Sequence, residues 1–198
     1  HNTTRRQRQM CIRDRYVTIA STGNTVDYGD LAVAREGMAQ GCISNGTRGI
    51  FSGGNSPTML NNIEFVTIMT TGNTSDFGDL AATISRQANC CSSTRGLFAG
   101  GMNPSNYNTI EFITIATLGN AADFGDLTSA RYNHGAASSP TRGVFLGGQP
   151  GPNGVNIIDF VEIATLGNAA DFGDTDVVGA DNGIIRPTGT SSNGHGGL

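Results

Sequence analysis

Pairs of aspartates with two residues between them recur along the chain, and their spacing is the first feature that suggests chemistry. The pairs are Asp27/Asp30, Asp76/Asp79, Asp123/Asp126 and Asp171/Asp174. Carboxylate oxygens are ligands that Ca²⁺ prefers, but these pairs lack the dense alternating oxygens of a calcium loop. Aspartate is also a favoured turn residue, because it bonds to nearby backbone amides. We therefore assign the aspartates to turns and predict no metal site.

Three arginines recur at intervals of 47 residues, namely Arg48, Arg95 and Arg142. A ring of guanidinium groups could bind an anionic ligand, whereas a fixed position in a repeat more often serves packing. We favour the structural role. The arginine would then bond to a turn carbonyl or to the carboxylate of Glu64, Glu111 or Asp159, since a guanidinium is suited to both kinds of acceptor.

The cysteines and histidines form no recognisable catalytic or metal-binding group. Cys42 and Cys90 each precede a serine by two residues, as Ala136 does in the next repeat, which indicates small buried side chains rather than a disulfide. His134 is the only histidine within a complete repeat. A catalytic triad or a metal cluster needs groups that converge, and the sequence indicates none. We predict no catalytic residue, no cofactor and no enzymatic activity.

A repeat of about 47 residues must position these side chains. TRGIFSGG returns as TRGLFAGG and TRGVFLGG, and each copy is followed by a segment such as NTIEFITIATLGNAADFGDL. The chain holds three full units, a leading half that begins at Tyr16 and a degenerate trailing half. Each unit predicts four strands: a stretch of small residues, a strand ended by Gly-Gly, an apolar strand expected to be buried on both faces, and a short strand after a turn.

Residues 1–15 share nothing with the repeats. Residues 5–15, RRQRQMCIRDR, resemble the translation of a sequencing-library adaptor, so we exclude residues 1–15 from the fold as non-native and disordered. Residues 16–198 contain 7 arginines and 15 acidic residues, a net charge of −8. This balance disfavours a nucleic-acid partner, which needs a basic face. No apolar run approaches the ~18 residues of a membrane helix, so we predict no membrane span.

The order of these features resembles the kelch repeat, whose period is ~50 residues. The positions that carry the resemblance are Arg35, Arg131, Gly53, Gly54, Gly100, Gly101, Gly147, Gly148 and the pairs Glu64–Phe65, Glu111–Phe112 and Asp159–Phe160. The second unit departs from the pattern, with Ile84 in the arginine position and Arg86 two residues later. The resemblance implies an all-β propeller of four-stranded blades over residues 16–190, followed by a frayed tail at 191–198. We interpret it as an incomplete part of a larger propeller, and the alternative is a small propeller of four blades.

More narrowly, the TRG-x-F-x-GG and ATLGNA-x-DFGDL segments are similar to those of kelch-like repeat proteins of marine tailed phages. This similarity implies a non-catalytic structural or receptor-binding protein, virion-associated or extracellular, whose partners are other virion proteins or a protein or glycan of the host surface. Two alternatives stay open: a cellular or secreted kelch-like interaction module, and a fragment of a carbohydrate-active enzyme.

The loops that follow the Gly-Gly pairs vary while the frame does not. Binding sites usually lie on variable loops carried by a rigid scaffold, and an aromatic residue beside an amide suits a sugar. The alternative is that these loops are solvated connectors without a ligand. The predicted binding residues are Asn55, Asn103, Asn106, Tyr107, Gln149 and Asn153.

Overall fold

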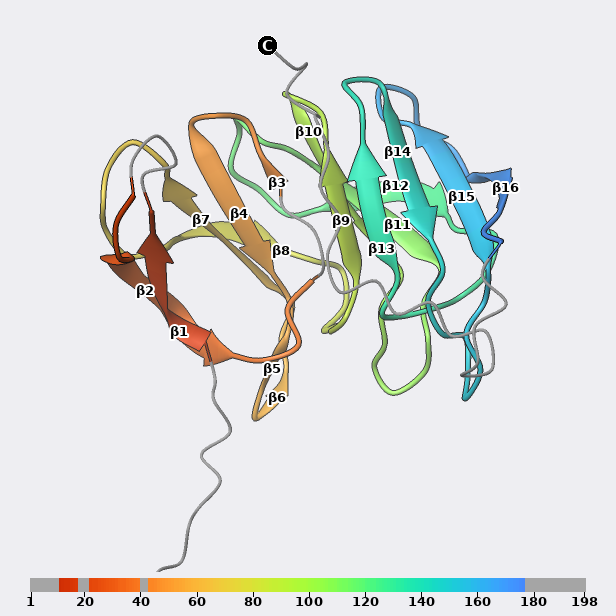
Figure 1. The fold of residues 1–198 in the computed structure, drawn as a ribbon, viewed down its shortest axis with the longest axis horizontal. Coiled ribbons are helices and arrows are strands. Elements are labelled where there is room, and N and C mark those ends of the chain that lie inside the picture. Colours follow the sequence, from red (N-terminus) through yellow and green to blue (C-terminus); the bar gives the residue numbers. More distant parts are fainter. Residues whose placement is uncertain (1–10, 18–21, 40–42, 177–198) are drawn as a thin grey trace, which may run out of the picture.

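The computed structural model describes residues 11–17, 22–39 and 43–176, and these residues are all β with no helix. A two-stranded sheet and three four-stranded antiparallel sheets stand side by side in chain order (Figure 1). Within these residues there is therefore no helix that could cross a membrane. The predicted all-β class is confirmed.

Each four-stranded sheet follows the order of its strands along the chain. The loop between Ser52 and Asn62 adds a small hairpin, in which Asn55–Ser56 pairs with Thr58–Met59, that the sequence did not predict. The strands are β1 (Cys11–Tyr16) and β2 (Val26–Arg35); β3 (Ile43–Ser44), β4 (Arg48–Ser52), β5 (Asn55–Ser56), β6 (Thr58–Met59), β7 (Asn62–Thr67) and β8 (Ser75–Asp79); β9 (Ala88–Cys91), β10 (Arg95–Ala99), β11 (Thr109–Thr114) and β12 (Ala122–Asp126); and β13 (Gly135–Ser138), β14 (Arg142–Leu146), β15 (Ile157–Glu162) and β16 (Ala170–Asp174).

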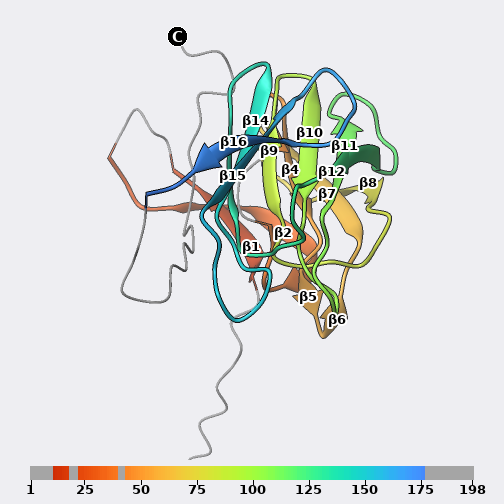
Figure 2. The same ribbon diagram turned by 90° about the vertical axis from the view of Figure 1, so that its right-hand side faces the viewer.

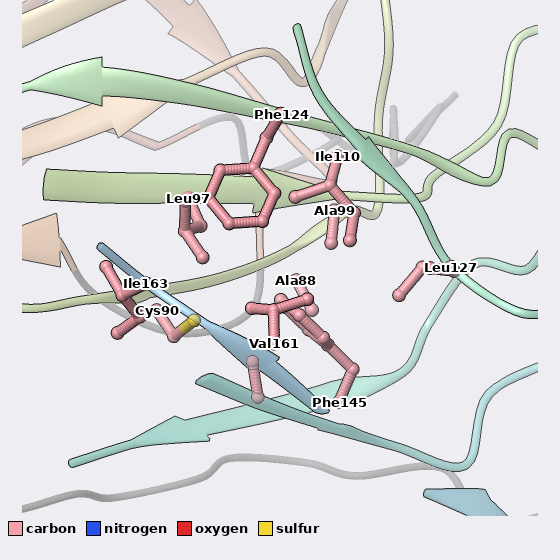
Figure 3. Packing of buried hydrophobic residues seen from close by; sticks show 11 residues of the cluster. Ala88, Cys90, Leu97, Ala99, Ile110, Phe124, Leu127, Phe145, Val161 and Ile163 are labelled. Atoms are coloured by element: carbon pink, nitrogen blue, oxygen red, sulfur yellow. The ribbon is translucent and has the colours of Figure 1, made fainter. Parts of the chain in front are cut away.

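The hydrophobic core lies between successive sheets, which pack face to face (Figures 1 and 2). One cluster joins Leu97, Ile110 and Phe124 of the third sheet to Phe145 and Val161 of the fourth (Figure 3). A second cluster joins the second and third sheets in the same way. Burial of these apolar side chains, at about 25 cal/mol per Å², therefore depends on a neighbouring sheet.

The strand buried on both faces is not the one we predicted. Every residue of β9 is buried, because this strand of small residues contacts both β3 and β13. In β11 only Ile110 and Ile113 are buried, whereas Thr114 is exposed and Phe112 is half-buried. Phe112 packs against the apolar cluster, and the Arg95 guanidinium lies 4.7 Å from the centre of its ring.

Each junction between sheets uses the same three hydrogen bonds from the outermost strand of one sheet to the Gly-Asn turn of the next. Gly119 N donates to Phe77 O at 2.8 Å, Asp79 N donates to Asn120 Oδ1 at 3.0 Å, and Ala121 N donates to Asp79 O at 2.8 Å. The same bonds recur 47 or 48 residues later and one unit earlier. The turn is therefore a connector between sheets.

The expected disorder of residues 1–15 differs from the structure in one part. Cys11–Tyr16 forms β1 and pairs antiparallel with β2, with Tyr16 opposite Val26 as Phe65 is opposite Ser75. Residues 1–10, 18–21, 40–42 and 177–198, and with them Cys42 and the predicted tail at 191–198, lie outside the described residues.

Candidate functional site

The three loops that follow the Gly-Gly pairs lie at the same end of the sheets, at the bottom of Figure 1. This end of the sheets, which we call the loop end, begins where the Gly-Gly pair lets the chain turn sharply. Gly53 has a φ of +58°, and a Cβ there would lie 2.5 Å from Ile84 O. Gly100 is equivalent, with a φ of +59° and the Arg131 carbonyl oxygen 2.5 Å from such a Cβ. Glycine is thus required at these positions.

Between the first two of these loops lies a cleft of about 260 Å³. It combines a cation, an anion, thioethers and small polar groups, which is a mixture suited to a polar ligand with an apolar face. Its lining residues are Glu36, Gly37, Asn55, Met59, Ser85, Arg86 and Met102.

Arg86 is the most unusual residue of the cleft because its backbone φ is +60°, a value that residues other than Gly, Asn and Asp seldom adopt. Gly37 and Asn133 take the same place in the neighbouring repeats and also have positive φ. Arg86 N donates to Gly37 O, and Asn133 N donates to Arg86 O, both at 3.0 Å. These two bonds hold the backbone while the exposed guanidinium lies 6.0 Å from the Tyr132 ring centre.

Of the predicted binding residues, the structure brings only Asn55 into the cleft. Asn103 Nδ2 donates to Thr83 O at 2.9 Å, Asn106 Nδ2 donates to Pro150 O at 2.6 Å, and the Tyr107 hydroxyl donates to Asn103 O at 3.1 Å. The Asn106 bond joins two of the loops, the Tyr107 bond lies within its own loop, and the Asn103 bond ties that loop to the segment after β8.

The remaining two predicted residues also lie away from the cleft. Gln149 is buried and accepts a hydrogen bond from Asn133 Nδ2 at 3.1 Å, while Asn153 is exposed. Sequence reasoning missed Glu36 and Arg86 as lining residues. Aligning Arg86 with Gly37 and Asn133 would have marked it as a long cation at a turn position.

The repeated arginines do not pair with the carboxylates that we considered for them. Arg48 Nη1 donates to Ile115 O at 2.8 Å and Arg95 Nη1 donates to Ile163 O at 2.9 Å, each across a junction to the next sheet. The bond to a turn carbonyl, our other expectation, is the one present. Arg142 has its Nε 2.6 Å from Glu162 on the surface.

This difference predicts unequal effects of the same substitution. Arg95→Ala should lower the free energy of unfolding by about 1–3 kcal/mol, because it removes a charged hydrogen bond and a cation–π contact. Arg142→Ala should change it by about 0–1 kcal/mol, since its ion pair is exposed. Chemical denaturation of both variants checks the prediction, and equal losses would contradict it.

The buried carboxylates pair instead with arginines from the end of the preceding unit. Arg35 Nη2 bonds to Glu64, and Arg131 Nη2 lies 2.9 Å from Asp159 Oδ2, with all four side chains buried. In the second unit, Ile84 replaces the arginine and Glu111 accepts a hydrogen bond from Ala81 N at 2.9 Å. Burial raises the pKa of Glu111; the Ala81 amide acts in the opposite direction, and the charge of Asp123 adds to the rise.

Glu111 therefore gives a testable pH dependence. Its pKa is higher in the folded chain than in the unfolded one, so the unfolded chain releases the proton first as the pH rises, and the free energy of unfolding falls across that window. Glu111→Gln should remove this loss and raise the melting temperature at neutral pH, with no gain in acid. Thermal unfolding from about pH 4 to about pH 7 checks this, and an identical difference at every pH would contradict it.

The structure adds no convergent chemistry to the histidine and the cysteines. His134 is fully buried, and burial, together with the charge of Arg131, lowers its pKa to about 3. Cys90 is a buried free thiol whose pKa is raised by burial, and Cys91 Sγ donates to Ser44 O at 3.4 Å. Within the described residues, no three side chains of His, Cys, Asp or Glu are close enough to hold a metal ion.

The aspartate pairs act mainly through their backbones. The Asp79 and Asp126 amides donate across a junction, each to an asparagine side chain of the next turn. Our assignment of the aspartates to turns is wrong, because all four pairs lie within strands, namely β2, β8, β12 and β16. The Asp171 carboxylate accepts a hydrogen bond from Gly173 N at 3.0 Å, within β16 itself.

No model of a known protein family matches the chain, and no curated protein matches it.

Proposed function

We propose that the chain is a kelch-like β-propeller repeat scaffold that binds a surface glycan or protein without catalysis. In this proposal it is a structural or receptor-binding component of a tailed-phage particle, and it is virion-associated or otherwise extracellular. The cleft at the loop end is the observation that carries the binding role. The strand bridge that frames it recurs in each unit, but the residues that line the cleft differ from those at the equivalent positions of the next unit. The phage setting is supported by the similarity of the repeat segments alone.

The chemistry of the cleft favours a ligand with hydroxyl groups and a negative charge. The exposed Arg86 supplies donors for a carboxylate. Glu36 supplies acceptors for hydroxyl groups, and the thioethers of Met59 and Met102 offer apolar surface. An acidic sugar on a surface polysaccharide combines these features, as does a protein loop that presents a carboxylate beside an apolar side chain.

Binding to arrayed neutral and acidic surface glycans tests the proposal. The chain should bind acidic members, and Arg86→Ala should weaken that binding about tenfold or more, the loss expected of a charged hydrogen bond. Arg142→Ala is the matched control, because it removes an exposed arginine from β14, outside the cleft. Binding unchanged by Arg86→Ala would refute the role of the cleft. Labelling of purified particles with an antibody against the chain tests the virion setting.

A further inference from the structure

The two ends of the row of sheets expose side chains whose equivalents are buried at both junctions between four-stranded sheets. Phe172 on β16 is 57% exposed, whereas Phe77 and Phe124, its equivalents on β8 and β12, are each 2% exposed. At the opposite end, Val17 is 52% exposed, whereas its equivalents Val66, Ile113 and Val161 are 9%, 3% and 3% exposed. The register of Tyr16 opposite Val26 sets the equivalence of Val17 with Val66.

The exposed face of the last sheet, which we call the tail face, is defined by Arg142, Phe160, Phe172 and Gly173. Phe172 meets Phe160 edge to face at 5.8 Å, and the Arg142 guanidinium lies 5.0 Å from the Phe160 ring centre. The same stack of arginine and two aromatic rings occurs at Arg95, where the next sheet covers it and accepts its hydrogen bond. The tail face is therefore organised like a covered face.

The backbone of the tail face is also uncovered, as Gly173 shows. A Cβ built on Gly78 or Gly125 would lie 2.3 or 2.4 Å from the carbonyl oxygen of the next Gly-Asn turn, whereas one built on Gly173 meets nothing within 4 Å. The complementary face lies at the other end of the row, on the first sheet. It contains the Gly-Asn turn and the apolar side chain that correspond to those of the internal junctions. We call it the head face and define it by Val17 and Gly23.

We infer that the tail face of one copy of this chain docks on the head face of a second copy, and so continues the internal junction between molecules. A second copy is the partner that fits, because each face is one half of a contact that the chain already makes three times between its own sheets. Because the two faces differ, the contact is head-to-tail, and it closes into a ring or extends as a row according to the rotation between copies.

Sedimentation over a micromolar concentration series tests the inference. The wild-type chain should form dimers or larger species, and Val17→Glu or Phe172→Glu should each weaken self-association about tenfold or more. Both side chains are exposed within a single copy, so each variant should keep the wild-type melting temperature when dilute. Met69→Glu, at an exposed apolar residue in the loop after β7, is the matched control and should assemble like the wild type.

Mixing the two variants makes the test specific for a head-to-tail contact. Val17→Glu retains an intact tail face and Phe172→Glu retains an intact head face, so an equimolar mixture should form a dimer with one copy of each and nothing larger. A wild-type chain that stays monomeric would overturn the inference, as would a mixture that forms no such dimer. A monomer destabilised by either substitution would mean that the chain covers its own faces. Glycan binding by the cleft does not depend on these outcomes.

Discussion

Arg35→Met should lower the free energy of unfolding by about 3–5 kcal/mol, the range expected when one partner of a buried ion pair is removed. The substitution leaves the Glu64 carboxylate buried without its cation. It also removes donors to Gly53 O at 2.9 Å and Val33 O at 3.3 Å. Because Gly53 begins the turn to the loop end, this turn should also lose its support. Urea denaturation followed by circular dichroism measures the free energy of unfolding.

A double variant separates the effect of the unpaired Glu64 charge on stability from the effect of the lost Arg35 packing. Arg35→Met combined with Glu64→Gln should recover much of the stability, because it removes the uncompensated carboxylate. Glu111→Gln alone should not destabilise the fold at neutral pH, since no arginine occupies the equivalent position there. A loss below about 1 kcal/mol for Arg35→Met, the size typical of an exposed pair, would contradict the interpretation of the pair as buried and structural.

Gly125→Ala should destabilise the fold by about 1–3 kcal/mol more than Gly173→Ala. Both glycines have positive φ, +148° and +135°, so both substitutions strain the backbone. Only the new methyl group at position 125 meets Gly167 O, at 2.4 Å, and to relieve that overlap the junction must open and stretch the bond from Gly167 N to Phe124 O. The free energies of unfolding of the two variants give the difference.

The comparison is made at a concentration where the chain is a single copy, because a second copy on the tail face would crowd position 173 as well. Gly78→Ala serves as a repeat of the experiment one unit earlier, where the corresponding distance is 2.3 Å. Equal losses for Gly125→Ala and Gly173→Ala would show that backbone strain alone acts at this position.

The strands were predictable because their signals are local. The TRG-x-F-x-GG segments contain the whole of β4, β10 and β14, and the Gly-Gly pair marks their ends. The ion pairs were not predictable in the same way. Glu64 is preceded by both Arg35 and Arg48, and only the packing of one sheet on the next decides that Arg35 reaches the carboxylate while Arg48 reaches a carbonyl.

The composition of the candidate cleft could not be predicted from the sequence. The variable loops after the Gly-Gly pairs start from equivalent strands and therefore lie at one end of the sheets, where the cleft also lies. The loop amides, however, find partners far away in sequence: Asn106 bonds to the carbonyl of Pro150, 44 residues later. No local pattern shows which amides such bonds occupy, and none shows that Arg86 projects from a turn.

The junction hydrogen bonds have a consequence for how such a gene changes. Their donors and acceptors are backbone groups and the asparagine of a turn that each unit supplies, so deleting or duplicating one unit of 47 residues rejoins equivalent atoms. Recombination between tandem copies can therefore alter the number of units without creating a new interface. The loops at the other end of the sheets take no part in these bonds, which leaves their sequences free to diverge from one copy to the next.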